Sequence, residues 1–465
     1  MKKYSYRLKE GIPLASEKTL INDMSQGPVL SKLFRFALPI MLANLLQAVY
    51  SMVDMIIVGQ FCGAGGLSAV GIGGQISFLF LGVGMGLGNG GQVVISQQVG
   101  MKSEKISKTV GTMITLLFLC ALVIGAAGVI FHNPILDLLN TPPEARSNAA
   151  GYLVICSCGM VFIYEYNAIC AVLRGMGESR LPLVFIAVAS VINIVLDLLF
   201  VGLFRWEAAG AAAATVLAQA VAFFSGAAYL YRHRDALGFD FKLHSFRIDR
   251  EQLLALCRIG IPNVIQQILI TGSITFINAQ INAFGVTASA CDSIGGKLNS
   301  VANIVIGSIS VASSTMIAQS FGARNMERVR KTVRACFLIG LIWWAILASC
   351  YLLFPHFIFR MFTSEPSVLE MSGMYLRYAV IWLLALCSMD AFYALVNGIG
   401  FASFNLIVGL LDGVVARIGL SLLLGKIMGL PGFWLGSGLA GFVTTIAMGF
   451  YYLTGWWTKR EAVTK

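Results

Sequence analysis

The sequence predicts an all-α integral membrane protein, in which twelve transmembrane helices form two six-helix bundles related by a parallel pseudo-twofold repeat. Three observations support this fold class. Of the 465 residues, 57% are hydrophobic and only 12% are charged, against about 25% charged in soluble domains. Twelve apolar segments approach the ~20 residues that cross a bilayer. The second half of the chain also repeats the pattern of the first.

The apolar segments are justified in chain order by their length and hydropathy. The first six lie near 33–58, 68–95, 110–131, 150–173, 182–203 and 208–230, and the second six near 255–280, 288–318, 333–354, 373–396, 404–425 and 433–456. We expect helices, because lipid offers the backbone no hydrogen-bond partner. A β-barrel would instead show alternating segments of about ten residues.

Positive charges indicate the orientation. If the N-terminus is inside, 26 of the 33 lysines and arginines lie on one side of the membrane. The positive-inside rule then predicts that both termini are cytoplasmic. We expect a multi-pass protein of the plasma (inner) membrane. The net charge of +11 thus reflects topology and does not indicate a nucleic-acid partner. The polar N-terminal residues lack the short apolar core of a cleaved signal peptide, so we expect the first span to stay.

The same pattern predicts five parts of the chain. They are a cytoplasmic N-terminal segment (1–32), an N-terminal lobe (33–230), a cytoplasmic linker (231–254), a C-terminal lobe (255–456) and a cytoplasmic tail (457–465).

The two halves resemble each other in sequence. Pro39 and Pro262 are 223 positions apart in similar apolar segments. ISQQVGMKSEKISKTV (95–110) corresponds to IAQSFGARNMERVRKTV (317–333), and RGMG (174–177) to NGIG (397–400). Each half has an even number of spans, so both enter the membrane in the same direction, which makes the repeat parallel. Two bundles around a shared cleft are typical of transporters, and duplication for stability is the alternative.

Polar residues within the spans are the functional candidates. Asn193 and Asp197 are four residues apart in SVINIVLDLLFVGLF (190–204), so they share one helical face. A count of 1.5 Å per residue places Asp54, Asp197 and Thr215 within roughly 6–10 Å of the outer boundary. Three helices thus contribute to one buried polar cluster. Two neighbouring carboxyl groups there would share a proton or be neutralised by a bound cation.

The sequence resembles the multidrug and toxic compound extrusion (MATE) family over nearly its whole length. The resemblance rests on LPIMLANLLQAVYSMVDMIIVGQFCGAGGLSAVG (38–71), RGMGESRLP (174–182), NIVLD (193–197) followed by AAGAAAAT (208–215), and the repeated FxxxI(A/S)QxxG-type segments. The chain is most similar to the prokaryotic branch related to the DNA-damage-inducible protein F transporters.

The resemblance implies which residues couple transport to a cation. In similar members the matching Asp, Asn, Asp and Thr form a cation-coupling cluster in the N-terminal lobe. The resemblance therefore implies that H+ or Na+ binds at Asp54, Asn193, Asp197 and Thr215. It also implies that the two aspartates hold any Na+. Asn167 matches another polar position of that cluster. A helix-packing network without a transport role is the alternative.

Three further residues are candidates for substrate binding. Gln47 and Tyr50 share a helical face with Asp54 and are expected to face the cleft. Other branches of the family bind a cation in the C-terminal lobe, using a Glu on span 7 and an Asp on span 10. Span 7 has no acidic residue here, so Asp390 on span 10 is expected either to contact a cationic substrate or to serve in packing.

The predicted function is secondary active antiport and not enzymatic catalysis. The chain would export organic, cationic and amphipathic small molecules across the lipid bilayer by alternating access, with no cofactor besides H+ or Na+ and no obligate protein partner. No GxxxxGK[ST] motif is present, so ATP does not power transport directly. A flippase for lipid-linked saccharides is the alternative within transport, and a membrane enzyme or receptor is the alternative outside it. Asp292 with Lys297, and Asp412 with Arg417, are expected to neutralise each other as structural pairs.

Overall fold

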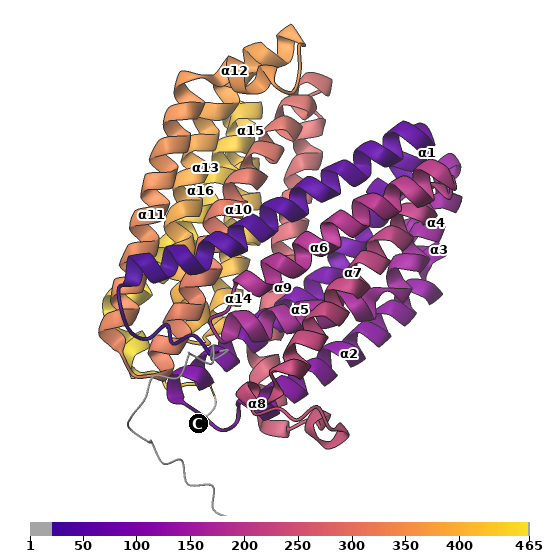
Figure 1. The fold of residues 1–465 in the computed structure, drawn as a ribbon. Coiled ribbons are helices and arrows are strands. Elements are labelled where there is room, and N and C mark those ends of the chain that lie inside the picture. Colours follow the sequence, from indigo (N-terminus) through magenta and orange to yellow (C-terminus); the bar gives the residue numbers. More distant parts are fainter. Residues whose placement is uncertain (1–20, 464–465) are drawn as a thin grey trace, which may run out of the picture.

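The computed structural model describes residues 21–463, which fold into two helical bundles (Figure 1). The N-terminal part of the predicted segment 1–32, residues 1–20, lies outside this range, as do residues 464–465 of the predicted tail. The first bundle, or first lobe, contains α1 (Val29–Met101), α2 (Ile106–Ile130), α3 (His132–Leu138), α4 (Pro143–Cys158), α5 (Met160–Gly175), α6 (Arg180–Asp197), η1 (Leu198–Leu203) and α7 (Glu207–Arg232).

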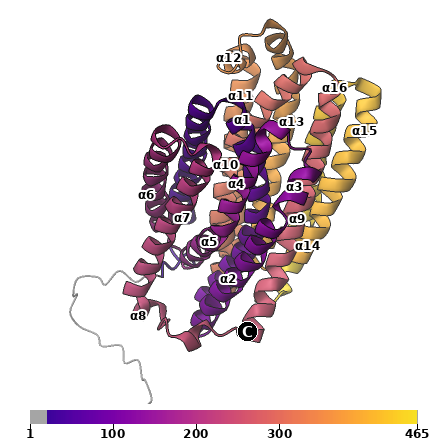
Figure 2. The same ribbon diagram turned by 90° about the vertical axis from the view of Figure 1, so that its right-hand side faces the viewer.

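The second bundle, or second lobe, follows a linker that carries α8 (Arg234–Leu237) and η2 (Leu243–Phe246). It contains α9 (Arg250–Asn282), α10 (Val286–Gly322), α11 (Met326–Leu353), α12 (Pro355–Arg360), α13 (Pro366–Gly398), α14 (Ala402–Leu410), η3 (Leu411–Ala416), α15 (Arg417–Met428), α16 (Leu430–Thr454) and η4 (Trp456–Lys459). Figure 2 shows this bundle from its side, with α15 and α16 at its edge.

The number of membrane spans confirms the predicted fold class. Among residues 21–463, eleven helices are long and apolar enough to cross a membrane, and α4 with α5, bent by 49°, makes twelve if the pair crosses as one span. The first two spans both lie in α1, which is interrupted at Gly63. The helix of the first span continues past residue 58 to this glycine, so Asp54 lies farther from the end of its helix than the sequence count assumes.

Two spans contain a π-helical turn. In the fifth span, η1 directly follows Asp197, and in the eleventh span η3 separates α14 from α15. A π-turn shifts the backbone hydrogen bonds from i→i+4 to i→i+5 and is frequent at functional sites. The two lobes therefore share this irregularity in the corresponding span.

The lobes touch at the end of the molecule where the described chain begins and ends, and they diverge toward the other end (Figure 1). We call the first the termini-bearing end. Small residues allow the contact, since a Cβ atom on Gly90 would lie 2.9 Å from the backbone nitrogen of Gly260, and one on Gly100 would lie 2.0 Å from the carbonyl oxygen of Gln319. Glycine at these positions is thus required for α1 to approach α9 and α10.

The linker between the lobes is fastened to the first lobe. Phe239, Phe241 and Phe246 pack edge to face, and Thr115 of α2 donates a 2.6 Å hydrogen bond to the carbonyl oxygen of Phe246. Asp249 then caps α9 by accepting from the backbone N–H groups of its first turn. The second lobe therefore begins at a well-defined helix cap beside α2.

The break in α1 yields a prediction about stability. Gly63 has φ 65° and ψ −162°, a region that is essentially restricted to glycine. Gly63→Ala should destabilise the protein by about 1–3 kcal/mol through backbone strain alone, because a Cβ atom there meets nothing within 4 Å.

The matched control is Gly74→Ala, which also introduces a Cβ atom into open space but in helical backbone. It should be neutral or slightly stabilising. The measurement is the thermal unfolding midpoint in detergent, and equal midpoints for the two variants would contradict the strain argument.

Candidate functional site

The first lobe holds two buried carboxyl groups that face each other. Asp54 lies on α1 and is 8% exposed, and Asp197 ends α6 and is 0% exposed. Their carboxyl groups lie within hydrogen-bonding reach. Among the described residues, neither oxygen of Asp197 nor Oδ1 of Asp54 accepts a hydrogen bond from a donor group. Two carboxylates offer each other no donor, so this contact is favourable only when a proton or another cation lies between them.

A small cavity lies one helical turn from the carboxyl pair. Its volume is about 10 Å³, which is near the lower limit for a single water molecule. Its polar lining comes from Tyr50 of α1, Ser190 and Asn193 of α6, and Thr215 and Gln219 of α7. Three helices thus direct polar side chains toward one point, as the sequence pattern of Asn193 and Thr215 suggests.

Several of these polar atoms lack partners. Both amide atoms of Asn193 and the Oε1 atom of Gln219 are buried and form no hydrogen bond within residues 21–463. Buried polar groups normally have a partner. A water molecule in the cavity, or a cation with its ligands, would supply one.

Sequence analysis missed Ser190 and Gln219. The signal that could have found them is helical spacing, because Ser190 precedes Asn193 by three residues and Gln219 follows Thr215 by four. Both side chains line the same cavity as the residues they accompany.

The remaining predicted residues lie at different distances from this cluster. Gln47 is exposed, and its side chain lies beside the hydroxyl group of Tyr50. Asn167 of α5 donates a 2.8 Å hydrogen bond to Ile163 of its own helix and does not line the cavity. Asp390 is half-buried on α13 of the second lobe, where Ser310 donates to its backbone carbonyl oxygen at 3.1 Å.

The chemistry of the cluster suits a hard cation. Among the described residues, no group of three or more His, Cys, Asp and Glu side chains could hold a metal ion. The two carboxylates and the nearby amide and hydroxyl groups offer oxygen atoms, which are the ligands that hard cations prefer. The same carboxyl pair can hold a proton.

One further acid in the first lobe stands apart. Glu165 on α5 is 4% exposed, and its Oε1 atom has no hydrogen-bond partner in the described chain. It does not line the cavity, and nothing in the structure assigns it a role.

The two predicted structural ion pairs have different outcomes. Asp412 and Arg417 are buried and approach to 3.4 Å, and Thr444 donates to Asp412 at 2.9 Å. The π-turn η3 explains this contact, because it brings residues five apart onto one face. The prediction of an ion pair between Asp292 and Lys297 is wrong.

In ordinary α-helix, residues five apart are separated by about 140° around the axis. Asp292 therefore turns toward α16, where it accepts a 3.0 Å hydrogen bond from Nε1 of Trp434. Lys297 is exposed, and no ion pair between Asp292 and Lys297 forms within residues 21–463.

Comparisons with known proteins place these features in a family. The sequence profile of the MatE family matches residues 39–199 and 262–423, one match in each lobe. The chain is 30% identical over 448 residues to the probable multidrug resistance protein YpnP of Bacillus subtilis (strain 168), covering 95% of this chain and 99% of the relative.

Solved structures show the same fold. An outward-facing multidrug resistance MATE family transporter of the MOP superfamily is 22% identical with a TM-score of 0.88, covering 96% of this chain and 100% of that chain. A MOP superfamily transporter from Pyrococcus furiosus is 21% identical with the same TM-score and the same coverage.

The buried ion pair of the second lobe yields a prediction. Arg417→Met should destabilise the protein by about 3–5 kcal/mol, because it leaves the Asp412 carboxylate buried without its countercharge. The double variant Asp412→Asn/Arg417→Met should recover most of this loss. Unfolding midpoints of both variants test the pair, and a double variant as unstable as the single one would refute the electrostatic explanation.

Proposed function

This chain belongs to the MatE family of multidrug efflux transporters, and we propose that it exchanges an organic, cationic and amphipathic compound for H+ or Na+ by alternating access. The coupling ion would bind at Asp54, Asn193, Asp197 and Thr215, with Asn167 as an additional polar position of the first lobe. The observation that carries the proposal is the pair of buried carboxyl groups without other donors.

Electrostatics explain why this pair would respond to an ion gradient. Two facing carboxylates in a low-dielectric environment repel each other strongly, and one bound cation removes that repulsion. The arrangement of α1 and α6 around Asp54 and Asp197 is therefore compatible with the neutralised pair. Loss of the cation would favour a different packing of the two helices.

The π-turn after Asp197 is the element that would change. η1 begins at Leu198, directly after Asp197. A movement of the Asp197 backbone would therefore act directly on the π-turn. A π-turn can convert to α-helix by shifting its hydrogen-bond register. Substrate that binds one packing of the first lobe better than the other would then be linked to the ion by a reciprocal coupling free energy.

Substrate would bind between the lobes. Gln47 and Tyr50 lie on the helix that carries Asp54, and Asp390 lies on α13 of the opposite lobe. A carboxylate and aromatic side chain are suitable partners for an organic cation. This placement gives each lobe one part of the proposed substrate site.

The proposed membrane is the plasma (inner) membrane, with both termini cytoplasmic. The distribution of Lys and Arg supports this orientation. In it, the termini-bearing end where the lobes touch faces the cytoplasm, so the structure corresponds to an outward-open state.

The decisive experiment measures efflux of a fluorescent organic cation from proteoliposomes under a pH gradient or a Na+ gradient applied separately. Asp197→Asn should reduce gradient-driven efflux by at least about tenfold and retain dye binding. Glu165→Gln is the matched control, because it neutralises another buried acid of the same lobe outside the cavity, and it should retain efflux. Unchanged efflux in Asp197→Asn would assign the carboxyl pair to packing and direct attention to Asp390.

A second prediction concerns the two carboxyl groups as a unit. If they share one cation, Asp54→Asn and Asp197→Asn should each reduce coupling to a similar extent, and the double variant should be no worse than either. The measurement is the ratio of efflux with and without the gradient for the three variants. Losses that simply multiply would show that the two aspartates act separately.

A further inference from the structure

Two buried glutamines occupy corresponding positions of the repeated segments ISQQVG (95–100) and IAQSFG (317–322). Gln97 of the first lobe donates through Nε2 to the carbonyl oxygen of Gly398 in the second lobe at 2.9 Å. Gln319 of the second lobe donates to the carbonyl oxygen of Gly175 in the first lobe at 3.1 Å. Gly175 and Gly398 themselves correspond in the repeat, so the two bonds form a reciprocal pair across the lobe contact.

The other end of each carboxamide holds a terminal segment. Oε1 of Gln319 accepts a 2.8 Å hydrogen bond from the backbone N–H of Met24. Oε1 of Gln97 accepts a 2.9 Å bond from the backbone N–H of Val463. We call residues 21–28 the N-terminal strap and residues 456–463 the C-terminal strap. Each glutamine is 0% exposed and joins three parts of the molecule: its own helix, the opposite lobe and one strap.

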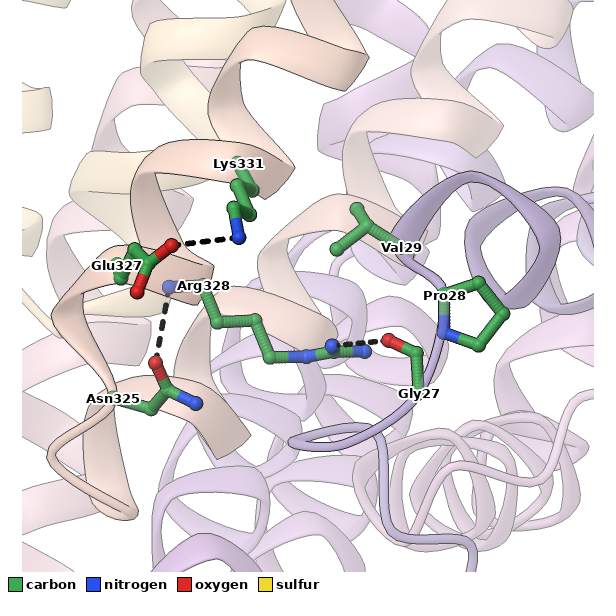
Figure 3. A pocket seen from close by; sticks show the side chains of 7 residues that line it. All are labelled: Gly27, Pro28, Val29, Asn325, Glu327, Arg328 and Lys331. Carbon is green, nitrogen blue, oxygen red and sulfur yellow. Dashed lines mark hydrogen bonds and ion pairs between the residues drawn. The ribbon is translucent and has the colours of Figure 1, made fainter.

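The N-terminal strap crosses between the lobes. On the first lobe, Asn22 donates from its backbone to the carbonyl oxygen of Met176 at 2.9 Å and from Nδ2 to that of Gly177 at 3.2 Å. On the second lobe, Arg328 of α11 donates to three strap carbonyl oxygens, those of Met24, Gln26 and Gly27, at 2.8, 2.8 and 2.6 Å. Figure 3 shows the Arg328 guanidinium group reaching Gly27.

The C-terminal strap is anchored on the second lobe. Trp457 is 0% exposed and donates to the carbonyl oxygen of Tyr452 at 3.1 Å. The guanidinium carbon of Arg460 lies 3.6 Å from the ring centre of Phe401. The backbone N–H of Val463 in the same strap then contacts Gln97 of the first lobe. Both straps therefore extend over the line along which the lobes would separate.

The backbones of α1 and α10 leave no room for a side chain at the same place. A Cβ atom on Gly100 would lie 2.0 Å from the carbonyl oxygen of Gln319, and one on Gly322 would lie 2.2 Å from that of Gln97. Gln97 and Gln319 thus lie where α1 and α10 are in close contact. Separation of the lobes at this point would break both carboxamide bonds.

We propose that Gln97 and Gln319 are positioning residues of the gate at the termini-bearing end, and that both straps are working parts of that gate. While the lobes touch, each carboxamide is held in place by its strap and by the opposite lobe. When the lobes separate, the buried amides lose their glycine acceptors and both straps are released. The inference rests on the proposed alternating access and adds a coupling between the two straps, which do not share a glutamine.

Hydrogen–deuterium exchange with mass spectrometry tests this coupling on the full chain in detergent without an ion gradient. Gln319→Met preserves side-chain length and removes both hydrogen bonds. Exchange should rise on the order of fivefold in peptides covering the N-terminal strap. It should rise also in peptides covering the C-terminal strap, which Gln319 does not touch. Gln97→Met should give the converse result.

Thr332→Val is the matched control. Thr332 is 0% exposed at the same end of the second lobe, and its hydroxyl group donates to the backbone carbonyl oxygen of Arg328 in its own helix at 2.9 Å. It should leave exchange in both straps unchanged. Asn22→Ala, at an exposed position, is a second variant that does not disturb the buried contact, and it should also accelerate exchange in both straps.

Acceleration confined to the strap nearest the substitution would overturn the proposal, because it would describe two independent anchors. Dye efflux under an ion gradient, measured on the same variants, separates this outcome from failure of the proposed function. Coupled strap release with no gradient-driven efflux even in the wild type would sustain the gate and refute antiport. Faster exchange in only one strap, together with intact gradient-driven efflux, would refute the gate and sustain antiport.

Discussion

The close crossing of α1 and α10 is the contact on which the arrangement of the lobes depends. At Gly100 and Gly322 the two backbones approach so closely that a methyl group on either would collide with the opposite chain. Lipid provides little hydrophobic force between helices, so close backbone approach and hydrogen bonds must hold them together. The reciprocal bonds of Gln97 and Gln319 are located there for this reason. The lobes diverge away from this contact (Figure 1).

α1 connects the two proposed working parts of the transporter. Its first half carries Asp54, and its second half, beyond the break at Gly63, carries Gln97. A change in how the first half packs against α6 would alter the angle at the break and so the position of the second half against α10. This is a mechanical link through one element, and Gly63, where the backbone leaves the helical conformation, is a point at which it can bend.

Hydropathy and periodicity were sufficient for the spans, the repeat and the shared face of Asn193 and Asp197, because these depend on local order along the chain. They were insufficient where a contact depends on a distant helix. Asp292 pairs with Trp434, which is 142 residues away, and spacing cannot reveal that partner. Gln219 and the two gate glutamines were likewise missed, because an amide in a span indicates a polar contact without naming its acceptor. The π-turn that brings Asp412 to Arg417 is also a tertiary feature.

The reciprocal bonds between Gln97 and Gly398 and between Gln319 and Gly175 have the form of an isologous interface, in which the same patch is used twice about a twofold axis. A half-length ancestor could have assembled into a symmetric homodimer through this patch alone. Within a single chain the two halves need not be identical. The present sequence shows the result, since the positions that correspond to Asn193 and Asp197 are Ala416 and Leu420. The lobe contact is thus the part of the repeat that both halves share, and the cluster of Asp54, Asn193 and Asp197 belongs to the first lobe.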